Sequence, residues 1–521
     1  MRQALAFDEE MGVGQSVVTK RLGPGLVAGF AAVVFLAQGP TSASADQVLR
    51  LASYSLPKAL GNPHSSTSIS EVYTWAAIFD NLTKVDATGR VLPSLALSWS
   101  ARDPLTWRFQ LREDVRFSNG EPFDAYAVAA NIEYITSEAA RRESVAREFR
   151  HVSGAKVVDT YTVDITTIQP VLVLPAKLAA FRMVAPRHWN ALGPEGFGQD
   201  PVGTGPFKVV KWRTAKIELA AYEGSWRPPQ VDRLEIYQVP DPSVRLQGIQ
   251  SGQLDIALHL APDDIQAVES AGNTMHIGPG ASVTGMAFVT QKDSPVRDRR
   301  VRQALNYAVD KQAIVDALFL GYTRPSGQPG IRGANGHNPD IEPYPYDPVK
   351  ARQLLAEAGY AGGFDMVAEV LLSGTTAAVP VYSFVAQQLA NVGVNLEVRS
   401  VHIAQLITKS ITGEWAGTAF GMSFDLKPTL DIMRPIPMHS CQRIKPWHCD
   451  ESVMPLIEAA QREFDPAQRL KLLHELARIY HDDPPMLYFY ELVLFDGLSK
   501  RVRGFNPTNR IINYDEIRLV D

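Results

Sequence analysis

Several features that mark particular protein classes are scarce in this sequence of 521 residues. It contains two cysteines, which excludes a disulfide-dense scaffold and a four-cysteine zinc module. Lysine and arginine number 51 against 56 acidic residues, so the net charge of -5 provides no basic surface for nucleic acid or for an anionic membrane. After residue 45, no apolar stretch reaches the ~18 residues of a membrane-spanning helix.

The remaining composition is that of a large folded protein. Hydrophobic residues make up 45% of the chain and charged residues 21%, so a sizeable core can form. At roughly 150 residues per domain, the length predicts about three domains. The 36 prolines and 37 glycines follow no period, which excludes a collagen-like repeat.

The N-terminal segment has the order of a secretory signal. Lys20 and Arg21 precede an apolar run from Leu26 to Ala37, and small residues follow it. We therefore expect residues 1–45 to be a cleaved signal peptide, with the cut before Asp46. The apolar run is shorter than the ~20 residues that a bilayer requires, so an uncleaved anchor is the less favoured alternative. The mature protein is predicted to be exported.

Strand and helix periodicities alternate after this segment. In Thr106–Leu111, apolar and polar side chains alternate, which predicts a strand with one buried face. An aspartate directly before an apolar-periodic stretch predicts a helix start, and four such positions are Asp124, Asp310, Asp347 and Asp465. Because strands and helices mix without an internal repeat, we predict an α/β or α+β protein.

Two long stretches, 186–206 and 321–348, read as irregular. Both are rich in glycine and proline. Loops of this length in compact proteins are usually functional or lie between domains. We therefore expect a site or a domain boundary near each of them.

No set of catalytic residues can be assembled. Gly203–Lys208 resembles the start of a phosphate loop, but Val209 follows where serine or threonine is required, so we predict a turn entering a strand. His474 and His481 are seven residues apart, not the four of a zinc-protease helix. Gly421–Asp425 lacks the closing glycine of a nucleophile elbow. The protein is predicted not to be an enzyme, and a secreted hydrolase is disfavoured.

His439, Cys441, His448 and Cys449 form a cluster with two interpretations. All four residue types can bind metal. In an exported protein, however, cysteines normally pair, and closing this ring of nine residues would stabilise the fold by about 2.5 kcal/mol. We predict a disulfide between Cys441 and Cys449 and no metal site, and we keep metal delivery through this cluster as an alternative.

A second cluster combines aromatic and charged residues. Trp415, Phe420 and Phe424 share a stretch with Asp425 and Arg434. Apolar walls with a few placed charges are what a small-molecule pocket requires. The same aromatics could equally be core residues, so both interpretations stay open.

Four stretches, in this order, carry a resemblance. They are LPSLALSW followed by LTWRFQLREDVRFSNGEPFDAYAV (92–99 and 105–128), GTGPFKVVKW leading to YEGSWRPPQVDRLEIYQVPDPSVRLQGIQSGQLDIA (203–212 and 222–257), PVRDRRVRQALNYAVD (295–310) and DPVKARQLLAEAGY (347–360). With them the mature chain resembles the extracellular solute-binding proteins of ABC importers, family 5, the class that includes dipeptide, oligopeptide, nickel and opine binders.

The resemblance implies a two-lobe periplasmic-binding-protein fold of the α/β class with a hinge. Lobe I would span about 46–285, with an inserted subdomain at about 86–200, and the chain would return to it at 491–521. Lobe II would span about 286–490. The lobes would close over one solute, and the closed form would be recognised by a permease.

The resemblance also implies the solute class. Peptide-binding members commonly carry an acidic residue in a Gly-Asp…Asp-Pro stretch that holds the peptide amine. Here the stretch is Gly421–Pro428, in which Asp425 matches and Lys427 replaces the second aspartate. We expect a peptide or similar amine-bearing solute, bound by Asp425, Arg434 and the three aromatics of the same stretch. A nickel or other metal complex and an opine-type solute are the alternatives.

The implied partners are an ABC permease and its ATPase at the inner membrane. The protein would work in the periplasm as a monomer without a cofactor. It would not bind nucleic acid.

Cys441 and Cys449 are expected to be oxidised to each other in exported protein, because no other cysteine is present to compete. Alkylation before reduction, followed by peptide mapping, should find neither thiol labelled. Two alkylated thiols in native material would show that the pair is reduced and would favour the metal alternative.

Overall fold

The computed structural model describes residues 46–66, 69–371 and 377–520, and the predicted signal peptide at 1–45 lies outside these described residues. Asp46–Asp521 form one compact unit, not the three domains that length alone suggested. Strands and helices mix in it, as the sequence predicted. None of the helices in the described ranges combines the length and the apolar character that crossing a bilayer requires.

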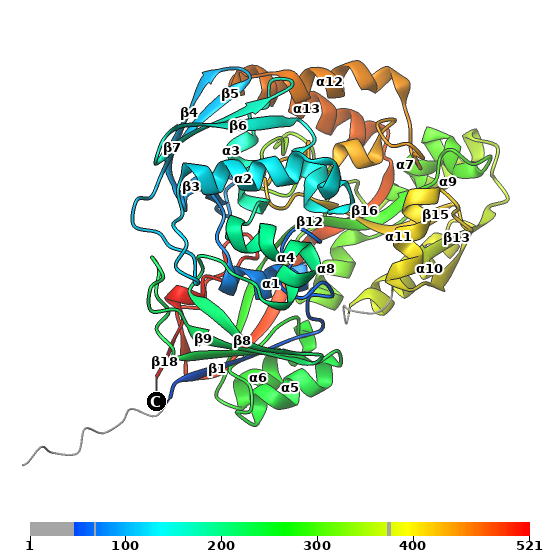
Figure 1. Cartoon of the computed structure of the whole chain (residues 1–521). Coiled ribbons are helices and arrows are strands. Elements are labelled where there is room, and N and C mark those ends of the chain that lie inside the picture. Colours follow the sequence, from blue (N-terminus) through cyan, green and yellow to red (C-terminus); the bar gives the residue numbers. More distant parts are fainter. Residues whose placement is uncertain (1–45, 67–68, 372–376, 521) are drawn as a thin grey trace, which may run out of the picture. The chain divides into compact units, whose positions relative to one another are not determined.

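The main sheet has ten strands, with two long antiparallel strands, β12 and β16, in its middle (Figure 1). Their pairing shifts register between Pro279 and Gly285. The order of strands across the sheet is β14 (Val394–Ser400), β13 (Phe364–Val370), β15 (Ala419–Asp425), β12 (Thr274–Phe288), β16 (Met486–Leu498), β11 (Ile256–Ala257), β1 (Val48–Ser53), β10 (Arg233–Gln238), β9 (Lys216–Ala221) and β8 (Phe207–Arg213).

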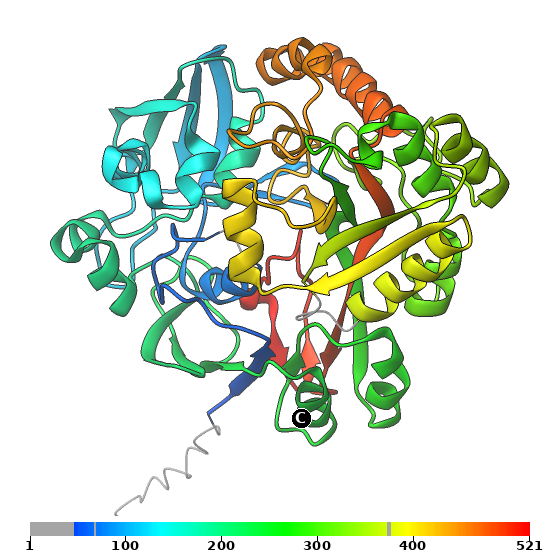
Figure 2. The same cartoon turned by 90° about the vertical axis from the view of Figure 1, so that its right-hand side faces the viewer.

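The two ends of this sheet are formed by different parts of the chain, 48–257 and 364–425. At one end β1 pairs in parallel with β10 and β11, and at the other β13 pairs in parallel with β14 and β15. In the turned view of Figure 2, the yellow-green to yellow strands β13 and β14 lie side by side. The helices around the main sheet are α1 (Ile69–Ile78), α5 (Pro242–Gln250), α6 (Ile265–Ser270), α7 (Arg299–Tyr307), α8 (Lys311–Phe319), α9 (Pro348–Glu357), α10 (Ala378–Ala390), α11 (Ile403–Thr412), α12 (Met454–Arg462) and α13 (Pro466–Asp482).

A second sheet of four strands lies within residues 96–167, inside the predicted inserted subdomain. In its strand β5 (Thr106–Leu111) alternate side chains are buried, which confirms the predicted strand. The other strands are β4 (Ala96–Asp103), β7 (Thr162–Thr167) and β6 (Val152–Asp159), and helix α2 (Ala125–Thr136) packs on β6. Smaller elements are α3 (Leu174–Lys177), α4 (Pro186–Gln199) and the two-stranded sheets β2 (Thr83–Val85) with β3 (Val91–Pro93) and β17 (Val502–Arg503) with β18 (Arg518–Leu519).

All four predicted helix starts are confirmed. Each aspartate side chain accepts a hydrogen bond from the backbone N–H three residues later, which satisfies one of the free donors of the first turn. The pairs are Asp124 with Ala127 at the start of α2, Asp310 with Ala313 at α8, Asp347 with Lys350 at α9 and Asp465 with Gln468 at α13.

The prediction that 186–206 is irregular is wrong for most of that stretch. Residues 186–199 form helix α4, which is interrupted at Gly193, where φ is 67°. Proline fits the first turn of a helix, so Pro186 and Pro194 each begin a helical half instead of preventing one. The second stretch, 321–347, contains only isolated bridges and is irregular as predicted.

The glycines of Gly203–Lys208 allow close packing of the backbone against α1. The chain continues into β8, as predicted. A Cβ atom on Gly203 would lie 2.1 Å from the carbonyl oxygen of Ile78 at the end of α1, so only glycine allows this approach. Between the two glycines, Thr204 donates a hydrogen bond of 2.9 Å to the buried carboxylate of Asp80.

Within the core, His64 is an unusual histidine. Its side chain is fully buried, and its ring lies against those of Phe181, Tyr134 and Trp189. Neither ring nitrogen has a hydrogen-bond partner among the described residues. Burial, with a smaller contribution from the charge of Arg182, lowers the pKa of His64 to about 3.

This burial makes stability depend on pH. The folded protein keeps His64 neutral, whereas the unfolded chain takes up a proton below pH ~6.5, so the free energy of unfolding falls as pH falls through that value. Between pH 7.5 and 5.5 the loss from this one residue is about 1.4 kcal/mol. Denaturant unfolding of His64→Phe should therefore show a smaller difference between the two pH values by about that amount. His402→Gln, at an exposed histidine, serves as the control. An unchanged pH difference in His64→Phe would show that His64 is not the cause.

Candidate functional site

A cavity of about 430 Å³ lies beside the middle strands of the main sheet. We call it the central cavity. Distant parts of the chain form its wall, among them Tyr54 and His259, Thr284 of β12, Val381 of α10, Met422 of β15 and Tyr490 of β16. This volume lies in the range of small-molecule sites.

The wall of the central cavity is largely apolar. Phe319, Leu406, Phe489 and other aliphatic and aromatic residues line it. Several of its polar groups are already engaged within the protein: Thr284 donates to the Tyr490 carbonyl at 3.1 Å, and the Tyr382 hydroxyl donates to the Gly285 carbonyl at 3.1 Å.

One end of the cavity is polar. His259 lines it, shares a hydrogen bond of 3.2 Å between its Nε2 and the Tyr73 hydroxyl, and donates its backbone N–H to Asp496 at 3.0 Å. Burial lowers the pKa of His259 to about 4, so the imidazole is neutral near pH 7. Arg510 lies at the same end and also lines a neighbouring cavity of about 170 Å³. His259 and Arg510 thus give this part of the cavity its polar character.

Asp425, the predicted amine-binding residue, is the last residue of β15. Its carboxylate lies 3.4 Å from the Lys427 ammonium and 3.6 Å from the Arg434 guanidinium. Burial alone would raise the pKa of Asp425, but the charges of Lys427, Arg434 and Arg510 outweigh it and lower that pKa. Asp425 is therefore ionised, and it is the most exposed of the bonded group, at 36% against 16% and 14% for Lys427 and Arg434.

Arg434 connects Asp425 to a second carboxylate. Its Nη1 donates to the Asp425 carbonyl at 2.9 Å, and its Nη2 donates to Glu148 at 3.3 Å. Glu148 also lies 3.7 Å from the ammonium of Lys177. The structure thus brings the predicted residues Asp425 and Arg434 together in one charged cluster, in which cations outnumber carboxylates.

The three predicted aromatics lie in the core. Trp415 stacks on Phe420 with ring centroids 3.7 Å apart, and Phe424 stacks on His439 at 4.1 Å. Their exposed fractions are 4%, 1% and 0%, and none of them is among the described residues of the central cavity wall. Their neighbours on β15, Gly421, Met422 and Ser423, do line the cavity. Direct contact of the aromatics with a solute stays a prediction.

The wall residues Tyr54, His259 and Arg510 were not found from the sequence. Each is a single residue in an otherwise ordinary segment, and they are separated by hundreds of positions. His259 and Arg510 have positive φ angles, 55° and 68°, but a single residue type does not reveal such an angle in advance. No signal in the sequence marks these three residues as members of one site.

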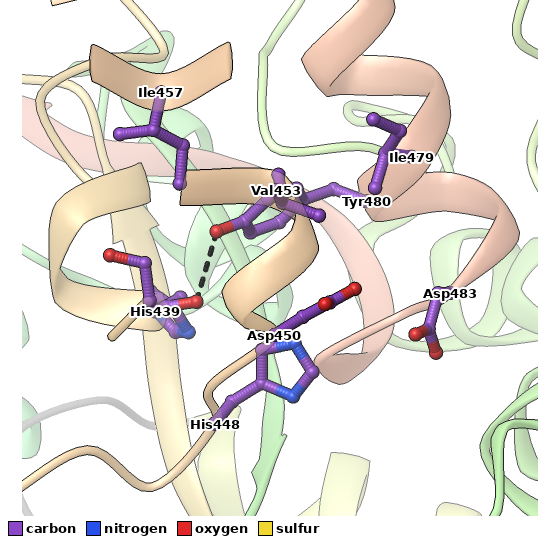
Figure 3. Close-up of a pocket in the computed structure, with 9 residues that line it drawn as sticks. His439, His448, Asp450, Val453, Ile457, Ile479, Tyr480 and Asp483 are labelled. Atoms are coloured by element: carbon purple, nitrogen blue, oxygen red, sulfur yellow. Dashed lines mark hydrogen bonds between the residues drawn. The ribbon is translucent and has the colours of Figure 1, made fainter. Parts of the chain in front are cut away.

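The predicted disulfide between Cys441 and Cys449 is confirmed. Both sulfurs are therefore unavailable as metal ligands. His439 and His448 line a small pocket in Figure 3, where the Tyr480 hydroxyl donates to the His439 carbonyl at 2.9 Å. Burial lowers the pKa of His439 to about 3 and that of His448 to about 4. Among the described residues, no three histidine, cysteine or acidic side chains are grouped as a metal site requires.

Comparison with known proteins gives a consistent result. The sequence profile of "Bacterial extracellular solute-binding proteins, family 5 Middle" matches residues 90–436. The glutathione-binding protein GsiB of Escherichia coli (strain K12) is 27% identical over 459 residues, which cover 82% of this chain and 86% of that protein.

Solved structures show the same fold. The periplasmic binding protein DppA of Helicobacter pylori, in complex with the peptide STSA, has a TM-score of 0.76 at 21% identity, covering 91% of this chain and 98% of that one. NikA of Brucella suis, in complex with Fe(III)-EDTA, has a TM-score of 0.78 at 21% identity and covers 91% and 100%. The predicted periplasmic-binding-protein fold is confirmed.

Proposed function

The chain belongs to the bacterial extracellular solute-binding proteins of family 5, which serve ABC importers, and from this premise we propose that it captures a peptide-like solute in the central cavity and delivers it to a membrane permease. The observation that carries the proposal is the cavity itself, about 430 Å³ with an apolar wall and one polar end. Its size suits a short peptide, and its wall suits apolar side chains. The similarity to a glutathione-binding protein supports a small peptide-like solute.

We propose the predicted lobes as the moving parts. Lobe I would comprise about 46–285 and 491–521, with the inserted subdomain at about 86–200, and lobe II about 286–490. Both boundaries fall within long strands, since β12 contains residue 285 and β16 contains residue 490. The ion pair between Glu148 and Arg434 would then join the two lobes and favour the closed form.

The proposal needs no chemistry on the solute. Its relatives are binding proteins, and binding between closing lobes accounts for capture and release without a catalytic group. Export by the signal peptide at 1–45 would place the protein in the periplasm. There, as a monomer, it would meet the permease and its ATPase.

Filling part of the central cavity with a larger side chain should weaken solute binding. Ala378, in the first turn of α10, lines the cavity, whereas its neighbour Val379 is 51% exposed. Ala378→Phe should weaken binding of the tightest ligand from a panel of dipeptides to pentapeptides by at least about tenfold, about 1.4 kcal/mol. Calorimetric titration measures this, with Val379→Phe as the matched control. Equal affinities of both variants and the wild type would place the solute elsewhere.

Asp425 is proposed to accept the solute amine, because its carboxylate is the most exposed member of its charged cluster. Charge-assisted hydrogen bonds contribute roughly 1.5–3 kcal/mol, and sharing with Lys427 and Arg434 places the expected loss at the low end. Asp425→Asn should therefore lower the affinity for a peptide with a free amine by about tenfold. The affinity for the same peptide with an acetylated N-terminus should change by less than about twofold. Equal effects on both peptides would remove Asp425 from amine recognition.

A further inference from the structure

Arg510 is the single charged residue among the described residues that line the central cavity. The only histidine among those residues, His259, is held neutral by burial, which lowers its pKa to about 4. No ion pair of Arg510 is formed within the described part of the chain, and the nearby carboxylate of Asp425 is already bonded to Lys427 and Arg434. The buried carboxylate of Asp496 lines the neighbouring cavity with Arg510 and accepts the backbone N–H of His259. On the central cavity wall no carboxylate of the described residues faces Arg510, so this end of the cavity attracts a negative charge.

The backbone under Arg510 is unusual. Thr508 and Ile511 exchange two backbone hydrogen bonds of 2.9 Å, which close a two-residue turn. Its central residues, Asn509 and Arg510, have φ angles of 49° and 68°. Turns with two positive φ angles strongly favour Asn-Gly, because a side chain at the second position is strained. Arginine here takes the place that glycine fills best.

The turn holds the guanidinium at the cavity, where it bonds the Tyr73 side chain and the backbone and leaves its Nε donor unused. The Asn509 side chain donates to the Pro428 carbonyl at 2.9 Å, which fastens the turn to the loop after β15. One Nη of Arg510 donates to the Gly280 carbonyl at 3.1 Å. The buried Nε of Arg510 has no partner among the described residues. Strained residues with unused donors are concentrated at binding sites, because the surrounding structure holds them there for a ligand.

We propose that Arg510 binds the carboxylate of the solute and that the central cavity selects acids with an otherwise apolar body. The chemical class is a short apolar peptide with a free carboxyl terminus, or an acylated amino acid. A planar guanidinium can bind both oxygens of a carboxylate, which fixes the orientation of the solute as well as its charge. This inference rests on the proposed function and identifies the carboxylate as the group of the solute that Arg510 binds.

The experiment compares matched acids and amides. Trileucine and N-acetyl-trileucine are titrated into the exported protein beside their C-terminal amides, and Arg510→Gly is the test variant. In the wild type each acid should bind at least tenfold more tightly than its amide. In Arg510→Gly that ratio should fall below about twofold. Arg503→Gln, at an exposed arginine of the same C-terminal segment, should keep the wild-type ratio.

The variant also separates binding from folding. Because glycine suits the second position of this turn, unliganded Arg510→Gly should melt no lower than the wild type. Arg510→Lys keeps the positive charge but lacks the planar guanidinium that can bond both carboxylate oxygens. It should therefore retain part of the preference for acids. A variant that melts much lower, or that keeps the full preference, overturns the assignment of Arg510.

The remaining outcomes distinguish the two proposals. If acids and amides bind the wild type equally, the carboxylate site is wrong while peptide capture stands. If no peptide of the wider panel and none of these four compounds binds, the proposed peptide-like solute is wrong, and the carboxylate site is wrong with it.

Discussion

The antiparallel pairing of β12 with β16 is the constraint on which the rest of the structure depends. These strands lie in the middle of the ten-stranded sheet and connect its two ends. They also form part of the central cavity wall, and their register shifts between Pro279 and Gly285, where that wall begins. A shift of register turns side chains to a new direction, so the same irregularity that bends the pair opens space beside it. Gly285 is required there because a Cβ atom would lie 2.4 Å from the Leu487 carbonyl oxygen.

A second constraint fastens the C-terminal segment, and with it Arg510, to the start of the chain. The buried guanidinium of Arg227 donates to Asp80 and to Asp515, each at 2.6 Å. The Tyr514 hydroxyl donates to the carbonyl of Tyr73 at 3.0 Å. Breaking a buried ion pair by removing one partner costs several kcal/mol, so these bonds hold residues 502–519 firmly in place. Both anchors, Tyr514 and Asp515, follow closely after the turn that carries Arg510.

We propose that the charged groups near the cavity recognise different ends of the solute. Asp425, Lys427 and Arg434 neutralise one another in part, which keeps a carboxylate ionised at the end of β15. Arg510 contributes the one charged side chain among the described residues of the apolar wall, and its charge also acts on Asp425. Asp425 is not among the described wall residues, but on β15 it closely follows one of them, Ser423. Charges of opposite sign at these two places suit a solute with an amine and a carboxylate. Affinity would come from the apolar contacts and orientation from the two charges.

Local features of this protein could be predicted from its sequence. The four aspartate caps, the alternation in Thr106–Leu111 and the strand after Gly205 each depend on interactions within a few residues, and all are confirmed. Pairing of Cys441 with Cys449 followed from their small number and short separation. The helix at 186–199 was missed because proline and glycine, which usually interrupt helices, here begin and divide one. The ordered family segments predicted the fold as a whole.

The site depended on tertiary structure. Asp425 and Arg434 are nine residues apart and were predicted to act together, yet the Glu148 that binds Arg434 is 286 residues away. The central cavity joins Tyr54, His259, Met422 and Arg510, whose side chains meet only after the sheet has formed. The sequence determined which segments form strands, helices and the disulfide, because those choices are made by near neighbours. Only the tertiary structure decided which charge faces the cavity, because that depends on contacts between segments hundreds of residues apart.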